Sequence, residues 1–381
     1  MQTAYLNQAG TSWPIPQPVR DAMAAAMTGS PADWSGSFDQ AHRVIAEFFH
    51  VGDPGRLLLT PGGTSALAVA VADHPWQPGD RVLTSSCEHH ALHRPLMKLA
   101  DRGVRIETVP PAQVGPLDLE RLERSLREGG VRLVAMTAAS NVTGDLLPVE
   151  QIVAHAHAHD TLVLIDAAQT AGWWDLDLPA LGADLMAFAG HKGLQGPWGI
   201  GGLYVAPHVT MNSPAAACEL PVDGGPPACA AMPGYCDTGS VDRIALAGLA
   251  AAVDWLREPA QQNRLARARQ QAEHLWQVAV NAGATLYGQA EPSRRLPTVA
   301  MTSPRQSPSE LARALAERGV IASGGLQCTP QMHQTLGTAP DGVLRLSVGV
   351  STTDEEIEWA AEVLDDVLRS PRSLPGQHFS G

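Results

Sequence analysis

Short apolar runs separated by amphipathic segments fill the first half of the chain. The runs are Leu57–Thr60, Arg81–Ser85, Arg105–Val109, Val131–Thr137, Leu162–Asp166, Leu185–Ala189 and Gly202–Val205. Several are apolar at nearly every position, which is typical of strands that are buried on both faces of a parallel sheet. The pattern therefore predicts seven strands of one central sheet.

Helix-like segments lie between these strands. They are Thr64–Asp73, His89–Arg102, Leu119–Glu128 and Val149–His159. Strands that alternate with helices in this way form a parallel sheet wrapped by helices. We therefore expect an α/β fold.

The rest of the chain has a different pattern. Residues 210–236 are rich in Pro, Gly, Ala and Cys, which indicates an irregular surface segment, and a helical pattern from Asp242 to Ala282 is interrupted near Pro259. Strands and helices return in the last third, over Thr298–Thr302, Ser307–Arg318, Gly342–Val348 and Asp354–Leu368. This part favours a smaller α+β domain.

Composition restricts the class of protein. The 381 residues are 44% hydrophobic and 17% charged, as in ordinary globular proteins, and the net charge is −13 at pH 7. An acidic surface argues against nucleic acid and against anionic membranes as partners. The five cysteines contain no CxxC pair, and the first residues lack a basic segment followed by an apolar run. We therefore expect a cytoplasmic protein with reduced thiols.

Two charged residues follow neighbouring predicted strands. Asp166 ends one apolar strand, and Lys192 follows the next one in a glycine-rich turn. Alone, Asp166 is more simply a helix N-cap and Lys192 a solvated loop lysine. Together they supply what pyridoxal phosphate needs, a carboxylate for the pyridine nitrogen and an amine for the aldehyde carbon.

A candidate phosphate cradle precedes this pair. Gly62, Gly63 and Thr64 join a strand to a helix, where free backbone N–H groups and a hydroxyl can bind an anion. The same residues also mark ordinary loop-to-helix turns. Their position upstream of Asp166 and Lys192 favours the phosphate interpretation.

The chain resembles aminotransferase class V, a family of fold-type I pyridoxal-phosphate enzymes, and within it the cysteine desulfurase and selenocysteine lyase branch. The motifs that carry the resemblance are TPGGTSAL, SSCEHHALHRPL, ASNVTGDLLPVEQI, IDAAQTAG, AGHKGLQGPWGIGGLYV, YCDTGSVDRIALAGL, GLQCTPQMHQTLG and VLRLSVGVSTTDEEI. The resemblance implies a large domain over residues 15–260 with a mostly parallel seven-stranded sheet. It also implies a small domain from residues 1–14 and 261–369, followed by a flexible tail over 370–381.

The resemblance also implies roles for individual residues. Lys192 is expected to bind pyridoxal phosphate as a Schiff base and to move protons, Cys328 to accept sulfur, and Arg345 to bind the substrate carboxylate. The other expected cofactor contacts are Asp166 at the pyridine nitrogen, Gln169 and Asn141 at the ring oxygen, His89 stacked on the ring, and Gly63, Thr64, His191 and Ser240 at the phosphate. Asn141 is also expected near the substrate, and Ser240 to reach the phosphate of a second subunit in a homodimer.

Cys328 can be considered without the resemblance. It lies in a glycine-flanked loop suited to a mobile thiol, although a free cysteine is most often a small buried residue. Ser323 and Gln327 occupy places where close relatives usually carry arginine and histidine, and Ala189 replaces a serine. We expect no metal site, and the histidines of AHAHAHD to form a solvated helix face.

The resemblance implies a cysteine desulfurase that converts L-cysteine, or a related amino acid, to L-alanine and leaves a persulfide on Cys328. A sulfur-acceptor protein is a possible partner. Two alternatives stay open on the same scaffold. One is another pyridoxal-phosphate reaction, namely a C–S lyase, an epimerase or an aminotransferase, and the other is a non-catalytic homologue that binds a sulfur acceptor.

Overall fold

A seven-stranded sheet forms the centre of the protein in this computed structural model, which describes residues 2–211, 218–219, 228–229 and 241–370. The strand order is β2-β8-β7-β6-β5-β3-β4, and β8 alone runs against its neighbours. The bounds are β2 Leu57–Thr60, β3 Arg81–Ser85, β4 Arg105–Val109, β5 Val131–Thr137, β6 Leu162–Asp166, β7 Leu185–Ala189 and β8 Gly201–Val205. This confirms the predicted α/β fold.

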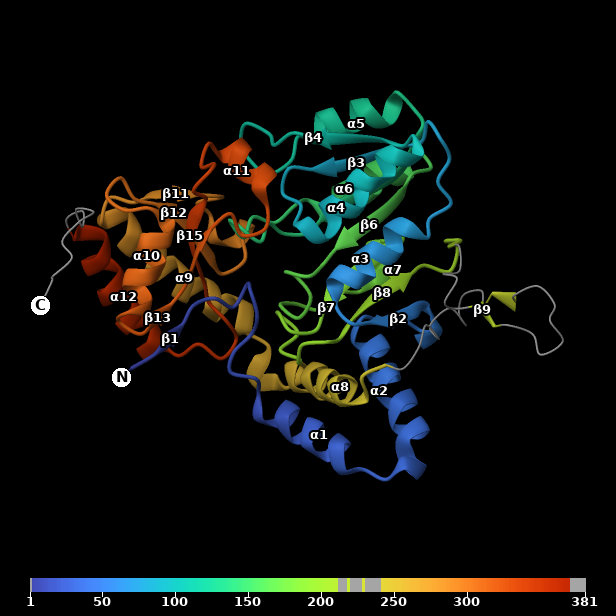
Figure 1. Ribbon diagram of the computed structural model, residues 1–381, viewed down its shortest axis with the longest axis horizontal. Coiled ribbons are helices and arrows are strands. Elements are labelled where there is room, and N and C mark those ends of the chain that lie inside the picture. Colours follow the sequence, from blue (N-terminus) through green and yellow to red (C-terminus); the bar gives the residue numbers. More distant parts are fainter. Residues whose placement is uncertain (1, 212–217, 220–227, 230–240, 371–381) are drawn as a thin grey trace, which may run out of the picture.

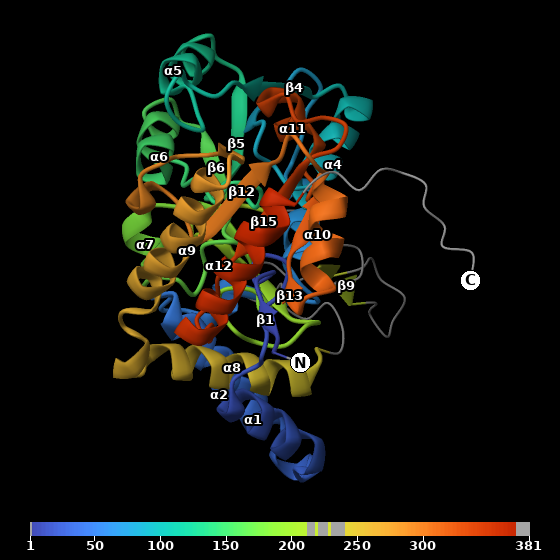
Figure 2. The same ribbon diagram turned by 90° about the vertical axis from the view of Figure 1, so that its left-hand side faces the viewer.

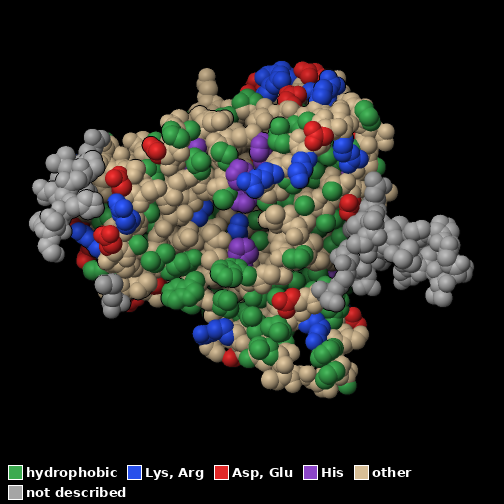
Figure 3. All heavy atoms as spheres, in the orientation of Figure 1, with side chains coloured by type: hydrophobic (Ala, Val, Ile, Leu, Met, Phe, Trp, Pro, Cys, Tyr) green, Lys and Arg blue, Asp and Glu red, His purple; other side chains and the backbone are tan. Residues whose placement is uncertain are grey.

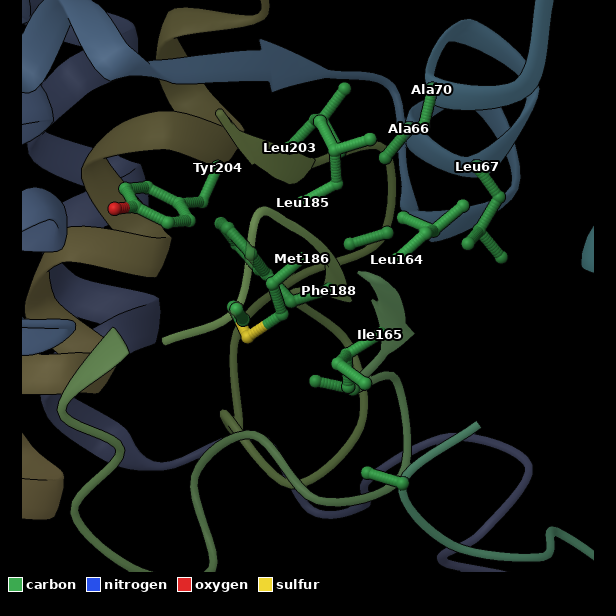
Figure 4. Packing of buried hydrophobic residues seen from close by; sticks show 14 of the residues in the cluster. Ala66, Leu67, Ala70, Leu164, Ile165, Leu185, Met186, Phe188, Leu203 and Tyr204 are labelled. Carbon is green, nitrogen blue, oxygen red and sulfur yellow. The ribbon is translucent and has the colours of Figure 1, made fainter. Parts of the chain in front are cut away.

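Helices cover the sheet and connect its strands (Figure 1). The large lobe contains α1 Gln17–Thr28, α2 Trp34–Phe48, α3 Gly63–Ala72, α4 His90–Lys98, α5 Leu119–Arg127, α6 Val149–His157, α7 Leu178–Leu181 and α8 Arg243–Arg257. Alternate residues of the strands point to opposite faces. Leu185 and Leu203 lie toward α3, whereas Met186 and Tyr204 lie on the other side (Figure 4).

A second, smaller lobe contains an antiparallel sheet in the order β11-β12-β15-β14. Its strands are β11 Thr285–Tyr287, β12 Thr298–Thr302, β14 Ser323–Gly325 and β15 Val343–Ser347, and its helices are α9 Arg264–Asn281, α10 Pro308–Ala316, α11 Pro330–Leu336 and α12 Asp354–Arg369. Near the N-terminus, β1 Ala4–Tyr5 pairs with β13 Val320–Ile321, so both ends of the described chain lie in this lobe (Figure 2).

The predicted elements agree closely with the structure. Six of the seven predicted strands have the same bounds, and β8 begins one residue earlier. The helical pattern over 242–282 forms α8 and α9, separated by a short 3-10 turn at Pro259–Gln261. Helices α1 and α2 have no counterpart among the predicted elements, because small and polar residues interrupt their apolar stripes.

Two hydrophobic cores accompany the two lobes, one mostly within residues 41–256 and one that joins Ala4 and Leu6 to residues 268–368. The division at residues 14/15 and 260/261 stays a prediction. Most of the segment 210–236 and residues 371–381 of the predicted tail lie outside the described residues. Within the described part, no helix is long and apolar enough to cross a membrane.

Gly172 permits the loop after β6 to contact the loop after β7. Its φ is +94°, and a Cβ atom built there lies 2.2 Å from the carbonyl oxygen of Gly193. A Cβ at Gly193 would in turn lie 2.5 Å from the Ala171 carbonyl oxygen. These two loops carry Gln169 and Lys192, so their close approach depends on glycine.

We predict that Gly172→Ala destabilises the protein more than Gly283→Ala does. Both glycines have positive φ, but a Cβ at Gly283 meets no atom within 4 Å. Both variants therefore share the left-handed penalty of roughly 1–2 kcal/mol, and Gly172→Ala adds overlap costing about 1–3 kcal/mol. Urea unfolding measures the difference, and equal midpoints for the two variants would contradict the prediction.

The buried His74 side chain makes the free energy of unfolding sensitive to acid. The ring is 1% exposed, and neither nitrogen has a hydrogen-bond partner among the described residues. Burial lowers the pKa of His74 from 6.5 to about 4, Arg132 adds to this, and Asp80 opposes it. Between these values the unfolded chain binds the proton more readily, so stability falls as the pH drops from about 6.5 toward 4.

We predict that His74→Phe loses less stability on acidification than the wild type, because phenylalanine cannot take up the proton. Between pH 7 and pH 5, the free energy of unfolding is expected to fall by about 2 kcal/mol more in the wild type than in His74→Phe. Urea unfolding at both pH values measures it, with the exposed His274→Phe as the control. The same loss of stability in wild type and His74→Phe would refute this assignment.

Candidate functional site

The carboxyl ends of β5, β6 and β7 form the base of the candidate site. Asp166 is the last residue of β6, where it pairs with Ala187 of β7 and with Thr137 of β5. In open parallel sheets, functional side chains collect beyond this edge. The loops that follow β5 and β7 carry Asn141 and Lys192, so strand pairing brings together residues that are far apart in sequence.

Lys192 is partly buried in the turn after β7. Its main-chain carbonyl accepts hydrogen bonds from the Gln195 N–H at 2.8 Å and from the Ser12 hydroxyl. Burial lowers the pKa of the Lys192 amine, Asp166 and Cys328 oppose this shift, and Arg345 adds to it. An amine with a lowered pKa is more often neutral and therefore more nucleophilic.

Asp166 is buried with its carboxylate oriented by the backbone. Its Oδ1 accepts a hydrogen bond from the Ala168 N–H at 2.9 Å. Burial raises the pKa of Asp166, while this hydrogen bond and the Lys192 charge lower it. A buried carboxylate in this position can stabilise a cation placed above the sheet edge.

His89 caps the N-terminus of α4. Its Nδ1 accepts a hydrogen bond from the Ala91 N–H at 3.0 Å, which leaves the proton of a neutral ring on Nε2. Burial lowers the pKa of His89 to about 4, and the charges of Lys192, His90, Arg345 and Arg94 add to this. The imidazole is therefore neutral at pH 7 and suited to contact a flat ring.

The N-terminus of α3 faces a groove of 660 Å³ that His89 and Cys328 also line. Thr64 is exposed in this groove, and Gly63 is the first helical residue. Figure 3 shows histidine side chains gathered between the two lobes on this face, beside lysine and arginine side chains. Free N–H groups at the start of α3 make this end of the groove suitable for an anion.

Ala189 lies against this helix start, since a Cβ built on Gly63 approaches the Ala189 Cβ to 3.3 Å. The position therefore offers a methyl group where a serine would offer a hydroxyl. Any anion at this end of the groove would depend more heavily on the backbone N–H groups and on Thr64.

The N-terminal segment closes the opposite side of the site. Gln169 donates to the Ala9 carbonyl oxygen at 3.1 Å, and His191 Nδ1 lies 3.1 Å from the Thr11 hydroxyl. Burial lowers the pKa of His191 to about 4, and the Lys192 charge adds to this. Gln169 and Lys192 also line the same small cavity.

Arg345 lies on β15, in the small lobe, and points into the site. Its Nη1 donates to the Asn141 carbonyl oxygen at 2.7 Å, and its Nη2 donates to Asn7 Oδ1 at 2.9 Å. The buried Nε has no partner among the described residues. Burial lowers the pKa of Arg345 to about 10, so the guanidinium stays charged at pH 7. The guanidinium has five N–H groups, so N–H donors remain for a carboxylate beside these two bonds.

Cys328 is exposed in the loop between β14 and α11. Its main-chain carbonyl oxygen accepts a hydrogen bond from the His90 N–H at 3.0 Å. Cys328 lies close enough to Lys192 and Arg345 to affect the pKa of both groups. The thiol therefore lies next to the cationic groups of the site, although Ser323 and Gln327 bind each other at 3.0 Å instead of supplying a charge.

Several contributors were not among the predicted site residues. Glu88 is buried, accepts hydrogen bonds from the Ser85 hydroxyl at 2.5 Å and the Thr137 N–H at 2.9 Å, and burial raises its pKa to about 8. Asn7 and Thr329 contact Arg345 and Asn141. The partners of Asn7 and Thr329 are distant in sequence, so spacing could not have identified these contacts.

Two further expectations concern residues outside this group. Ser240 lies outside the described residues. Among the histidines of AHAHAHD, His155 and His159 contact Glu123 of α5 at 2.6 and 3.3 Å, and His157 contacts Asp184 at 2.9 Å. Within the described chain, no group of three or more His, Cys, Asp or Glu residues is arranged to hold a metal ion.

Comparisons with known proteins agree with this geometry. The family model for aminotransferase class-V matches residues 4–359. A probable cysteine desulfurase of Pseudomonas aeruginosa is 30% identical over 397 residues, covering 96% of this chain and 93% of the relative.

Two solved structures share the fold. The apo cysteine desulfurase of Thermococcus onnurineus NA1 superposes with a TM-score of 0.89 at 24% identity, covering 96% of this chain and 95% of that one. A cystine C–S lyase in complex with its product cysteine persulfide has a TM-score of 0.82 at 24% identity, covering 96% and 98%. With the family match along nearly the whole chain, and with the sheet edge that joins Asp166 to Lys192, the protein belongs to aminotransferase class V, the pyridoxal-phosphate family expected from its sequence motifs.

Proposed function

We propose that the protein is a pyridoxal-phosphate-dependent cysteine desulfurase. The observation that carries the proposal is one site that combines a partly buried lysine near a buried aspartate, a buried arginine whose Nε has no partner among the described residues, and an exposed cysteine thiol. The lysine and the aspartate suit the cofactor. The arginine suits an α-amino acid, and the thiol suits transfer of sulfur.

The residues present fit pyridoxal phosphate. Asp166 offers a buried carboxylate for the pyridine nitrogen, and Lys192 offers an amine of lowered pKa for the aldehyde. Gly63, Thr64 and His191 can hold the phosphate, and Gln169 and Asn141 can contact the ring oxygen. His89, which is neutral at pH 7, can stack on the ring. When bound, the cofactor withdraws electrons from the amino acid and makes its Cα–H acidic.

The protein's own residues account for the remaining requirements. Arg345 orients the substrate through its carboxylate, since its buried Nε has no partner among the described residues and its Nη groups fix the plane of the guanidinium. The neutral form of Lys192 can take the proton from Cα and return a proton to the substrate. The thiol of Cys328 accepts the substrate sulfur.

The transfer balances without an added oxidant or reductant. The Cβ–S bond of L-cysteine breaks, a new S–S bond forms on Cys328, and a proton ends on Cβ. The products are L-alanine and a persulfide on Cys328. A second thiol must then remove the terminal sulfur, because the enzyme thiol has to be regenerated for each turnover.

We also propose that the enzyme acts as a homodimer with shared active sites, that a sulfur-acceptor protein collects the persulfide sulfur, and that it works in the cytoplasm. The exposed Cys328 at the groove supports an acceptor that approaches from solvent. The cysteine pattern, which lacks CxxC pairs, supports a reducing compartment.

The decisive experiment is product analysis of the holoenzyme with L-cysteine and a reductant. We expect L-alanine and sulfide in equal amounts, and enzyme-bound persulfide when the reductant is omitted. Cys328→Ala abolishes this reaction, because no other exposed thiol was found in the described part of the site. Pyruvate and ammonia as the products would overturn the proposal in favour of a C–S lyase.

Arg345→Lys tests the carboxylate site separately. Lysine keeps the positive charge but loses the planar fork that binds a carboxylate through two N–H groups. We expect kcat/KM for L-cysteine to fall roughly 100-fold. Steady-state alanine formation measures this, with the exposed Arg318→Lys as the control. A change of less than threefold would remove Arg345 from substrate binding.

A further inference from the structure

The loop that carries Cys328 has an unusual backbone. Gln327 and Cys328 have φ values of +50° and +59°, so two consecutive residues with side chains adopt the left-handed conformation. This conformation is unfavourable for residues other than glycine and persists only where other contacts hold it. The contacts of the loop therefore determine where the thiol points.

The Asn141 side chain forms hydrogen bonds with the residues on both sides of Cys328. Asn141 Nδ2 donates to the Gln327 carbonyl oxygen at 2.7 Å, and Asn141 Oδ1 accepts a hydrogen bond from the Thr329 hydroxyl at 2.8 Å. Thr329 is fully buried. The residues immediately before and after Cys328 are thus tied to the same side chain of the large lobe.

The same asparagine is connected to the substrate site. Arg345 Nη1 donates to its main-chain carbonyl oxygen at 2.7 Å. Other hydrogen bonds also hold the loop. The Gln327 side chain donates to the Ser323 carbonyl oxygen at 3.2 Å, the Thr329 N–H donates to the Leu326 carbonyl oxygen at 2.9 Å, and the His90 N–H of α4 donates to the Cys328 carbonyl oxygen at 3.0 Å. Asn141 therefore links the loop to Arg345 from the large lobe, whereas Ser323, which pairs with Arg345 across β14 and β15, links them within the small lobe.

We propose that Thr329 is a positioning residue, and that its hydrogen bond to Asn141 forms a latch that aims the Cys328 thiol at an amino acid bound by Arg345. The inference rests on the proposed function, because it assigns the latch to delivery of the thiol to the substrate sulfur. Thr329 itself takes no part in bond breaking. It holds the left-handed loop so that the thiol and the substrate stay aligned.

The test compares Thr329→Val with Thr329→Ser in the holoenzyme. Valine has nearly the shape of threonine but cannot donate to Asn141, whereas serine keeps the hydroxyl. With valine we expect kcat for alanine formation to fall about 10- to 100-fold with KM for L-cysteine changed less than threefold, because misplacement of a reacting group lowers the rate of the chemical step. Serine is expected to stay within threefold of wild type. Thr335→Val, which removes an exposed hydroxyl of α11, serves as the control.

A second readout does not depend on turnover. Iodoacetamide modifies the Cys328 thiol, and mass spectrometry of the peptide that contains it gives the rate. We expect Thr329→Val to change this rate at least threefold, and L-alanine to slow it in wild type much more than in Thr329→Val. If the valine variant does not fold, Thr329→Ala replaces it in the same assay.

The two readouts separate the possible failures. Wild-type enzyme that makes no alanine from L-cysteine overturns the proposed function, while the alkylation contrast still tests the latch. Equal kcat and equal alkylation rates for Thr329→Val and wild type overturn the latch. An effect of Thr329→Ser as large as that of Thr329→Val overturns it too, since the hydroxyl would then not be the determinant.

Discussion

The site depends on placing an amine and a carboxylate together at a sheet edge that is largely removed from water. Burial lowers the pKa of Lys192 and raises that of Asp166, and each charge partly compensates the other. Neither group would have these properties in solvent. The parallel pairing of β6 and β7 provides the burial, and the close approach at Gly172 keeps the two following loops in contact.

The two lobes contribute different parts of the chemistry. The large lobe supplies the groups that suit a cofactor, whereas β15 and the β14–α11 loop of the small lobe supply Arg345 and Cys328. Asn141 joins the lobes through a hydrogen bond to Arg345, and Asn7 holds Arg345 from within the small lobe. Because charge-assisted hydrogen bonds in a buried setting are strong and directional, the position of the small lobe affects both substrate binding and thiol delivery.

The neutral histidines follow from the same electrostatics. His89 lies close to Lys192 and Arg345, and His191 lies close to Lys192. Burial also removes the water that would stabilise a proton on either ring. Arg345 therefore keeps its positive charge at pH 7, whereas the lowered pKa of Lys192 favours its neutral form. In the neighbouring loop, Gln327 has a structural function, because its side chain binds Ser323.

The sequence by itself determined the strands, the α/β class, the family and the identity of Lys192, Asp166, His89, Arg345 and Cys328 as candidates. Solid apolar runs and local motifs carry this information, because they reflect burial and short-range geometry. Only the tertiary structure decided that Asn141 and Thr329 connect the lobes, that Asn7 holds Arg345, and that Glu88 is a buried carboxylate beside Asp166. Those contacts join residues up to 338 positions apart, so no spacing along the chain encodes them.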